Sequence, residues 1–346
     1  MTYYMELDAA ARTLVNYVLG VKKGEDVLIY GDTLNDEAVL KATAAAAYSA
    51  GATPTMVVTE TRQISFAEPP KPLAAAMMDA DVAIEFSVKA LLYTKAQINA
   101  LKRNRAYICL TSLDREAMVR TIGWVDYPKM VELGEKLAEL TTKAKEIKVT
   151  SPSGTDFSAK IGGRKFENYG GTAEKRKIIM LGGQTGGTCL EETQNGILAF
   201  DGNIWPPDEI KNNIRTPIKF KVEKGIIKEI TGGEEAEILR KYLAGFKDPN
   251  MYRIAHFCYG YHPLARQTGD IAEVERVWGC FQVGFGRQGP LLRPDLGGRL
   301  GWDAASHDDG IILKASIWLD GEPVQKDGKF IHPELVQIIK EWGIEQ

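Results

Sequence analysis

The first 110 residues alternate short apolar runs with segments of helical periodicity, and this alternation restricts the fold more than any other feature. The predicted strands are residues 26–30, 55–59, 81–86 and 106–110. Between them apolar residues recur at helical spacing, and glycines such as Gly20 and Gly51 follow the predicted helices as stop signals. Such a chain predicts a parallel α/β sheet with helices on both faces.

This first half carries neither G-x-G-x-x-G nor a G-x-x-x-x-G-K-S/T loop, so the sequence predicts no dinucleotide or nucleoside triphosphate site. Ligands of open parallel sheets bind at the carboxyl ends of the strands. That position belongs to Asp32, Thr33 and the loop over 87–94, for which ordinary turn and helix-capping chemistry is the alternative explanation.

The texture of the chain changes after a long amphipathic helix predicted over residues 130–147. Glycine becomes dense, and strands and hairpins replace the alternation. We predict hairpins over 148–159 and 218–230, strands at 278–283 and 311–319, and a helix over 235–246. The sequence therefore predicts a Rossmann-like α/β domain over residues 1–147, followed by a β-rich α+β metal-binding domain over residues 148–346.

An H-x-D triplet lies at the start of the strand predicted around Ile311. Side chains alternate along a strand, so His307 and Asp309 point to one face with Cα atoms about 6.6 Å apart, and Asp308 points to the other. An imidazole and a carboxylate at this spacing can close on one divalent ion, and one more ligand completes a facial triad. The alternative is a structural histidine that is hydrogen-bonded to its neighbours.

The third ligand has to come from a chain with only four histidines. His256 and His262 lie together in the segment 252–263, whereas His332 lies apart from them in a C-terminal segment, between Lys329 and Pro333. We favour His256 over His262 because a strand end holds a ligand more rigidly than a turn does. The predicted metal ligands are His256, His307 and Asp309.

A glycine-rich stretch over residues 286–298, with Arg287 and Arg293, precedes the predicted metal strand. We expect a long loop there, either a lid or anion clamp or a solvated connection.

Composition restricts the possible partners. A formal net charge of −3 and a pI near 6.0 argue against nucleic acid. No apolar run reaches the roughly 18 residues of a membrane span, and no signal-peptide pattern opens the chain. The four cysteines lie far apart without C-x-x-C spacing, which predicts reduced thiols in the cytoplasm and no thiolate zinc site.

Four segments of the chain together resemble a known family. They are residues 232–240, Asp248-Pro249, residues 256–260 and the triplet at 307–309. In order and spacing they are similar to 2,5-dihydroxypyridine 5,6-dioxygenase, a mononuclear non-haem iron enzyme, most clearly from about residue 146 to 325. That family is itself similar to the aminopeptidase T type of metallopeptidase, which holds two metal ions. The resemblance implies a homodimer.

Matching the segments distinguishes these two branches. The peptidase's two glutamate ligands fall at Gln184 and His256, and two of its histidines fall at Gln282 and Ala305. Too few anionic ligands remain for a dinuclear site, whereas the predicted triad matches the iron ligands of the dioxygenase.

The resemblance also implies substrate-handling residues. Tyr93 lies where the dioxygenase has a histidine thought to act as the base, and another pocket histidine is replaced near Ile179. Tyr93 is then the expected proton donor or acceptor, and Gln184 and Gln282 are expected to orient the substrate through hydrogen bonds. Structural hydrogen bonding is the alternative for all three.

We therefore expect an Fe(II) dioxygenase that opens a hydroxylated aromatic or N-heteroaromatic ring of a small-molecule substrate. Two neutral imidazoles and one carboxylate around a dication leave a positive site, which suits an anionic hydroxy-ring ligand. One alternative is a mononuclear metallohydrolase that acts on an amide or peptide through water activated by zinc or manganese. Another is a binding protein with a vestigial metal site.

Overall fold

A computed structural model describes residues 4–103, 105–172, 178–211, 214–288 and 302–346. The chain forms two compact units, and each is described by itself. The first consists of Met1–Tyr127 and Tyr169–Gly182, and the second of Pro128–Asn168 and Gly183–Gln346. The chain thus passes between the units three times, while the domains expected over 1–147 and 148–346 stay a prediction.

The first unit is built on a parallel sheet with the strand order β2-β1-β3-β4-β8. Its strands are β1 (Asp26–Asp32), β2 (Thr53–Thr59), β3 (Val82–Glu85), β4 (Ala106–Cys109) and β8 (Ile178–Met180). The predicted parallel α/β half is confirmed. The fifth strand, β8, was not predicted, because only three residues form it and they lie far along the chain.

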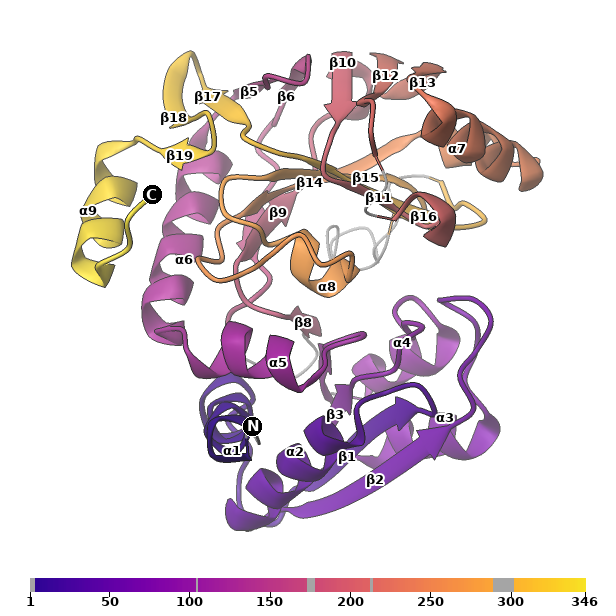
Figure 1. Ribbon diagram of the computed structural model, residues 1–346, viewed down its shortest axis with the longest axis vertical. Helices are drawn as coiled ribbons and strands as arrows, with labels where there is room; N and C mark the ends of the chain where they lie inside the picture. Colours follow the sequence, from indigo (N-terminus) through magenta and orange to yellow (C-terminus); the bar gives the residue numbers. More distant parts are fainter. Residues whose placement is uncertain (1–3, 104, 173–177, 212–213, 289–301) are drawn as a thin grey trace. The chain divides into compact units, whose positions relative to one another are not determined.

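Helices connect these strands. They are α1 (Tyr4–Arg12), which continues as a π-helix (Thr13–Val18), α2 (Glu37–Ser49), α3 (Lys71–Asp79), α4 (Lys95–Lys102) and α5 (Arg115–Met118), followed by a second π-helix (Val119–Gly123). The chain moves outward from β1 to β2 and then back across the sheet to β3 and β4. Right-handed crossovers therefore put α2 on one face and α3 and α4 on the other (Figure 1).

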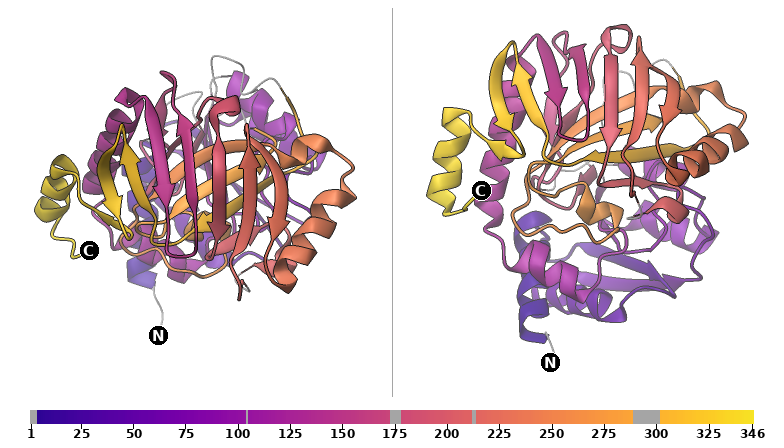
Figure 2. Two further views of the ribbon diagram at one scale, coloured as in Figure 1. Left: turned by 90° about the horizontal axis from the view of Figure 1, so that it is seen from above. Right: turned by 45° about the horizontal axis from the view of Figure 1, so that its top comes forward.

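The second unit contains two antiparallel sheets (Figure 2). The eight-stranded sheet has the order β13-β12-β10-β6-β5-β17-β18-β19, and the six-stranded sheet has the order β11-β16-β15-β14-β9-β7. The strands are β5 (Glu146–Thr150), β6 (Asp156–Lys160), β7 (Phe166–Asn168), β9 (Gln184–Gly187), β10 (Asn195–Phe200), β11 (Asn203–Trp205), β12 (Ile218–Glu223), β13 (Ile226–Thr231), β14 (Ile254–Gly260), β15 (Phe281–Gly286), β16 (His307–Ile312), β17 (Ser316–Leu319), β18 (Glu322–Lys326) and β19 (Lys329–Phe330). The predicted β-rich second half is confirmed.

Aromatic side chains fill the space between the two sheets. The rings of Phe157 on β6 and Phe257 on β14 lie 5.4 Å apart between centroids. Those of Phe220 on β12 and Phe285 on β15 lie 5.2 Å apart. All four side chains are buried, so one face of the six-stranded sheet belongs to this apolar core. The other face of the six-stranded sheet carries a different set of side chains.

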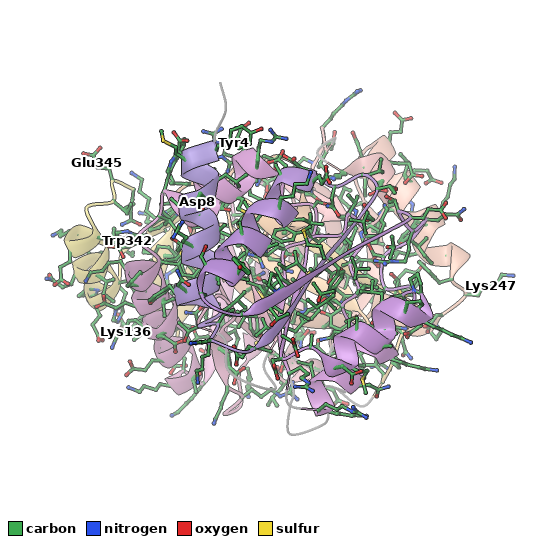
Figure 3. All side chains as sticks on the ribbon, turned by 90° about the horizontal axis from the view of Figure 1, so that it is seen from below. Tyr4, Asp8, Lys136, Lys247, Trp342 and Glu345 are labelled. Carbon is green, nitrogen blue, oxygen red and sulfur yellow. The ribbon has the colours of Figure 1, made fainter. Side chains whose placement is uncertain are left out.

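Among its described residues, the second unit contains the α-helices α6 (Tyr127–Lys143, whose first residue belongs to the first unit), α7 (Glu234–Gly245), α8 (Ile271–Val274) and α9 (Pro333–Trp342). Lys136 of α6 pairs with Glu334 at the start of α9 at 2.9 Å; Figure 3 labels Lys136 and also Trp342 at the end of α9. Helix α6 begins at Tyr127 and ends at Lys143, so both of its ends lie before the predicted ones at 130 and 147. Its expected last turn is the start of β5 instead, where the Asp320 carboxylate accepts hydrogen bonds from the backbone N–H groups of Lys145 and Glu146.

The strand predicted over 311–319 is two strands. Strand β16 ends at Ile312 in the six-stranded sheet, and β17 starts at Ser316 in the eight-stranded sheet. The turn between them includes Lys314 with a φ of 48°, a left-handed conformation that interrupts a strand. Residues 311–319 are rich in β-branched and aromatic side chains, so the sequence pattern does not show that the chain changes sheet there.

Two further observations bear on the composition argument. The four cysteines are free thiols and all are buried. Among the described residues, no helix combines the length and the apolar character that crossing a membrane requires.

Candidate metal centre

Three neighbouring strands of the six-stranded sheet, β14, β15 and β16, form the candidate site. In their antiparallel register His256 lies opposite Gly284, Gly284 lies opposite Asp309, and Gly286 lies opposite His307. Residues that face each other across strands share one face of a sheet, so His256, His307 and Asp309 project from the same side. This is the face turned away from the aromatic core, where α8 lies (Figure 1).

The structure brings these three side chains together. His256 Nε2 is 3.4 Å from Asp309 Oδ1, and His307 Nε2 is 3.2 Å from Asp309 Oδ2. The imidazole rings stack with centroids 5.0 Å apart and planes 16° from parallel. One ligand atom from each residue lies within 4.8 Å of the other two, and all three residues are buried. In the described part of the chain no other group of three or more such side chains meets this condition.

Gly284 provides the space for the His256 ring. A Cβ atom built on Gly284 lies 2.2 Å from His256 Cε1 and 2.7 Å from Nε2, which is inside the ring's own volume. Any side chain at position 284 would therefore displace the imidazole. A glycine on this face of β15 is the local sequence feature that allows ligands from β14 and β16 to meet above it.

The hydrogen bonds of His307 fix which of its nitrogens faces the carboxylate. Its Nδ1 lies 2.5 Å from the carbonyl oxygen of Arg287, which can only accept, so Nδ1 carries a proton. In a neutral imidazole Nε2 then presents a lone pair to Asp309. His307 Nε2 and Asp309 Oδ2 would then be two acceptors only 3.2 Å apart, which requires a positive charge at this place. That charge is either a proton on one of the two atoms or a metal ion between them.

The pKa values of the three groups also indicate that the site needs a positive charge. Burial acts to lower the pKa of His307, but the Asp309 carboxylate outweighs it and raises the pKa to about 9. Burial acts to raise the pKa of Asp309, yet the two imidazoles hold it below its usual value. The pKa of His256 is lowered, chiefly by burial. The Asp309 carboxylate is thus ionised and attracts a cation.

This donor set fits a divalent transition metal. Two imidazole nitrogens and one carboxylate oxygen on one side of an ion are the ligands of a facial triad, and the same donors also suit zinc or manganese. The arrangement is buried and contains one anionic group, and the glycine below it leaves room for the rings. The three donors present therefore fit a single ion.

Both predicted substrate-binding glutamines lie beside the triad. Gln282 Nε2 donates to Asp309 Oδ1 at 2.5 Å, and Gln184 Nε2 donates to Gln282 Oε1 at 2.9 Å. Arg276 and Glu275, which directly follow α8, complete this cluster, and Arg276 Nη2 donates to Gln184 Oε1 at 3.0 Å. Sequence reasoning missed this charged pair, since adjacent charged residues in a loop are typical of solvent-exposed positions.

Tyr93 belongs to the first unit, in the loop between β3 and α4. It has a φ of 65°, its ring centroid lies 5.6 Å from that of Phe66, and its backbone N–H donates to Gln97 Oε1 at 3.3 Å. Its expected role in proton transfer stays a prediction.

Other residues singled out from the sequence have structural partners. Asp32, at the end of β1, accepts a hydrogen bond from the Val88 backbone at 2.8 Å, as expected for turn chemistry. Ile179 is buried on β8. Most of the arginine-bearing stretch predicted as a loop, including Arg293, lies outside the described residues.

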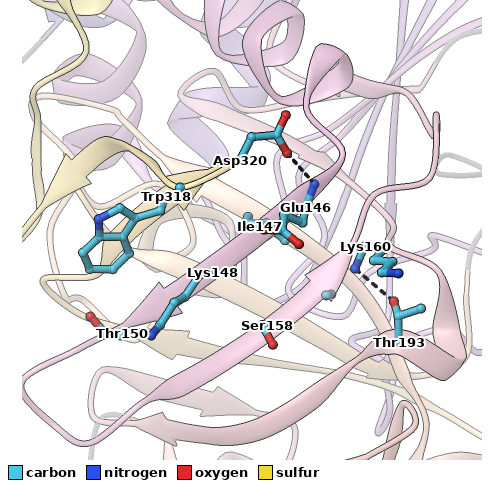
Figure 4. A pocket seen from close by; sticks show the side chains of 11 residues that line it. Glu146, Ile147, Lys148, Thr150, Ser158, Lys160, Thr193, Trp318 and Asp320 are labelled. Atoms are coloured by element: carbon cyan, nitrogen blue, oxygen red, sulfur yellow. Dashed lines mark hydrogen bonds between the residues drawn. The ribbon is translucent and has the colours of Figure 1, made fainter.

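A hollow of about 530 Å³ lies over β5, β6 and β17, and none of the triad lines it (Figure 4). Its polar side chains bond to nearby backbone: Asp320 accepts from the Glu146 N–H at 2.9 Å, and Thr193 Oγ1 accepts from the Lys160 N–H at 2.9 Å. This hollow therefore contains no cluster comparable to the triad.

Comparisons with known proteins agree with the resemblance seen in the sequence. A family model described as 2,5-dihydroxypyridine 5,6-dioxygenase matches residues 14–332. A 2,5-dihydroxypyridine 5,6-dioxygenase from Pseudomonas putida is 29% identical over 256 residues, which cover 70% of this chain and 69% of that protein.

Two solved structures share the fold. That of 2,5-dihydroxypyridine dioxygenase from Pseudomonas putida KT2440 has a TM-score of 0.78 at 22% identity and covers 97% of this chain and 99% of its own. That of wild-type AmpT from Thermus thermophilus has a TM-score of 0.69 at 15% identity and covers 96% of this chain and 100% of its own. The predicted similarity to both groups is confirmed.

Proposed function

The chain belongs to the 2,5-dihydroxypyridine 5,6-dioxygenase family, and on that basis we propose that it is a mononuclear Fe(II) dioxygenase that cleaves a hydroxylated N-heteroaromatic ring. The observation that carries the proposal is the buried triad of His256 on β14 and of His307 and Asp309 on β16, the two strands that flank β15. These residues would hold the iron. When bound, Fe(II) supplies a position at which a ring substrate and O₂ meet, and the electrons that activate O₂.

The protein's own groups prepare this site. The carbonyl of Arg287 holds the proton on Nδ1 of His307, so that its Nε2 lone pair is available for the ion. The carboxylate of Asp309 stays ionised between the two imidazoles. One carboxylate against a dication leaves the centre with a net positive charge, which favours an anionic, deprotonated hydroxy-ring substrate.

Several expectations accompany this proposal. We propose Tyr93 as the proton donor or acceptor on the basis of the family resemblance alone. Substrate contacts of Gln184 and Gln282, a homodimeric assembly and a cytoplasmic location likewise stay predictions from the sequence.

The proposal is tested by anaerobic reconstitution of the purified protein with Fe(II), followed by measurement of O₂ uptake with 2,5-dihydroxypyridine. We expect O₂ uptake in step with substrate loss, and no such uptake by His307→Ala, which removes one of the three ligands. His332→Ala is the matched control because His332 lies at the start of α9, outside the triad. A His307→Ala protein with full iron content and full activity contradicts the assignment.

The sequence also left open a metallohydrolase that uses zinc or manganese. The same reconstitution separates the two, since a hydrolase acts on an amide or peptide without O₂. Gln184 and Gln282 are neutral amides and add no anionic ligand, which supports a site for one ion in either case.

A further inference from the structure

A continuous chain of buried hydrogen bonds leads from Arg276 to the triad. Arg276 donates through Nη2 to Gln184 Oε1 at 3.0 Å, Gln184 donates through Nε2 to Gln282 Oε1 at 2.9 Å, and Gln282 donates through Nε2 to Asp309 Oδ1 at 2.5 Å. Arg276 is completely inaccessible to solvent, and both amides are buried. Water therefore has no access with which to replace these contacts.

The chemistry of Arg276 fixes the direction of these hydrogen bonds. A guanidinium group can only donate, so Gln184 has to turn its oxygen toward Arg276 and its NH₂ group toward Gln282. Gln282 accordingly turns its own oxygen toward Gln184 and its NH₂ group toward Asp309. If either amide turned over, two donors would face each other in a buried site. Both amide orientations thus follow from one charged group.

Glu275 holds the same cluster from a second side. Its carboxylate accepts from Arg276 Nη1 at 2.9 Å, from Gln184 Nε2 at 3.2 Å and from Gln282 Nε2 at 3.4 Å. The buried charge of Arg276 is therefore compensated, and both NH₂ groups have an additional acceptor. Every amide oxygen and nitrogen of the two glutamines is engaged within the protein.

We propose that Gln282, oriented by Arg276 through Gln184, is a positioning residue that controls how Asp309 binds the metal ion. Its N–H group engages Oδ1, which lies 3.4 Å from His256 Nε2, and so favours Oδ2, which lies 3.2 Å from His307 Nε2, as the oxygen that binds the ion. The two glutamines then act on a metal ligand, a role separate from the substrate contacts predicted for them from the sequence. This inference rests on the proposed metal centre and goes beyond the proposed reaction.

The test compares three substitutions that keep side-chain length but remove the amide: Gln282→Met, Gln184→Met and Gln325→Met. Gln325 is the matched control, because it is a fully buried amide on β18 that donates to the backbone oxygens of Gly279 and Ala315 at 2.9 Å each. Full-length, metal-stripped proteins are titrated anaerobically with Fe(II) and with Co(II), whose ligand-field spectrum reports the geometry around the ion.

We expect Gln282→Met to bind either ion about 10- to 100-fold more weakly than the unsubstituted protein and to shift the Co(II) spectrum. Gln184→Met should change the metal affinity and the Co(II) spectrum in the same direction but by less. In that variant Gln282 keeps its amide group and loses only the contact that fixes its orientation. Gln325→Met should lower thermal stability and leave metal affinity and spectrum unchanged. That contrast separates a positioning role from loss of a buried amide in general.

Two results overturn the inference: Gln282→Met binding both ions as tightly as the unsubstituted protein, or Gln325→Met weakening binding as much as Gln282→Met does. An unsubstituted protein that binds neither ion overturns both this inference and the proposed metal centre. If the metal data follow expectation but 2,5-dihydroxypyridine gives no O₂ uptake, the proposed reaction fails and the positioning role stands.

Discussion

At the scale of single residues, the site depends on a glycine, which has no side chain. Gly284 lies between His256 and Asp309 in the register of three strands, and the His256 imidazole occupies the volume that a Cβ atom on Gly284 would take. The backbone of β15 has neighbours on both sides in the sheet and cannot retreat without breaking its ladders. An added methyl group therefore has to move the imidazole.

We predict that Gly284→Ala lowers the metal content of the purified protein by about tenfold or more, because the His256 ring leaves its place. Metal analysis of protein prepared without chelator measures this. Gly245→Ala is the control: nothing lies within 4 Å of a Cβ there, at the end of α7, and alanine should be neutral or stabilise by up to about 1 kcal/mol. Unchanged metal content in Gly284→Ala contradicts the role assigned to this glycine.

The sequence predicts part of this site for a local reason. His307 and Asp309 are two positions apart, so strand alternation alone puts them on one face. Glu275 and Arg276 could not be predicted in the same way, because their partner Gln184 is 91 and 92 positions away and is reached only after the sheet has formed. Gly284 gives no chemical signal in the sequence, since its contribution is the absence of a side chain.

At the scale of elements, the parallel sheet of the first unit contains a buried carboxyl group at the end of β3. Glu85 accepts hydrogen bonds from Ser87 Oγ at 2.5 Å, from the Leu91 N–H at 2.7 Å and from the hydroxyl of Tyr107 on β4. Tyr30 on β1 continues the cluster with its hydroxyl 3.4 Å from that of Tyr107. The three central strands of the sheet thus share one polar cluster.

This cluster predicts a pH dependence of stability. Burial raises the pKa of Glu85 above 4.5, so the folded state binds this proton more tightly than the unfolded state does. The stabilisation is complete below pH 4.5 and is lost as the pH rises through the folded-state pKa, at about 1.4 kcal/mol per pH unit. Glu85→Gln cannot ionise, so its thermal stability relative to the unsubstituted protein should increase as the pH rises above 4.5.

Thermal unfolding across a pH series measures this difference. Glu60→Gln, at an exposed position after β2, controls for the loss of a carboxylate. If Glu85→Gln and the unsubstituted protein keep a constant difference at every pH, the burial of Glu85 does not control stability.

The elements themselves could be predicted where the signal is local. Four parallel strands and the antiparallel hairpins follow from apolar runs, helical spacing and turn residues. Strand β8 could not be predicted, because a three-residue strand has little pattern of its own. The break between β16 and β17 could not be predicted either. The choice of sheet at Lys314 depends on pairing partners far away in the chain.

At the scale of the whole molecule, all three proposed ligands belong to the second unit. We predict that Fe(II) or Co(II) stabilises the folded protein by about 2.7 kcal/mol at a free concentration 100 times the dissociation constant, because the ion binds only the folded triad. Hydrogen exchange should slow most in β14, β15 and β16, and a chelator should reverse the effect. His307→Ala is the control, and equal stabilisation of that variant contradicts the predicted binding site.

The division of the chain into interleaved units has a consequence for its synthesis. Strand β8 belongs to the first unit but follows Asn168 of the second, so a nascent polypeptide released at residue 127 lacks an edge of its own sheet. The ribosome has to deliver β5, β6 and β7 before the first unit has all its strands. No single cut in the gene therefore yields two intact halves, and fragment expression of either unit requires joining segments that are apart in the natural chain.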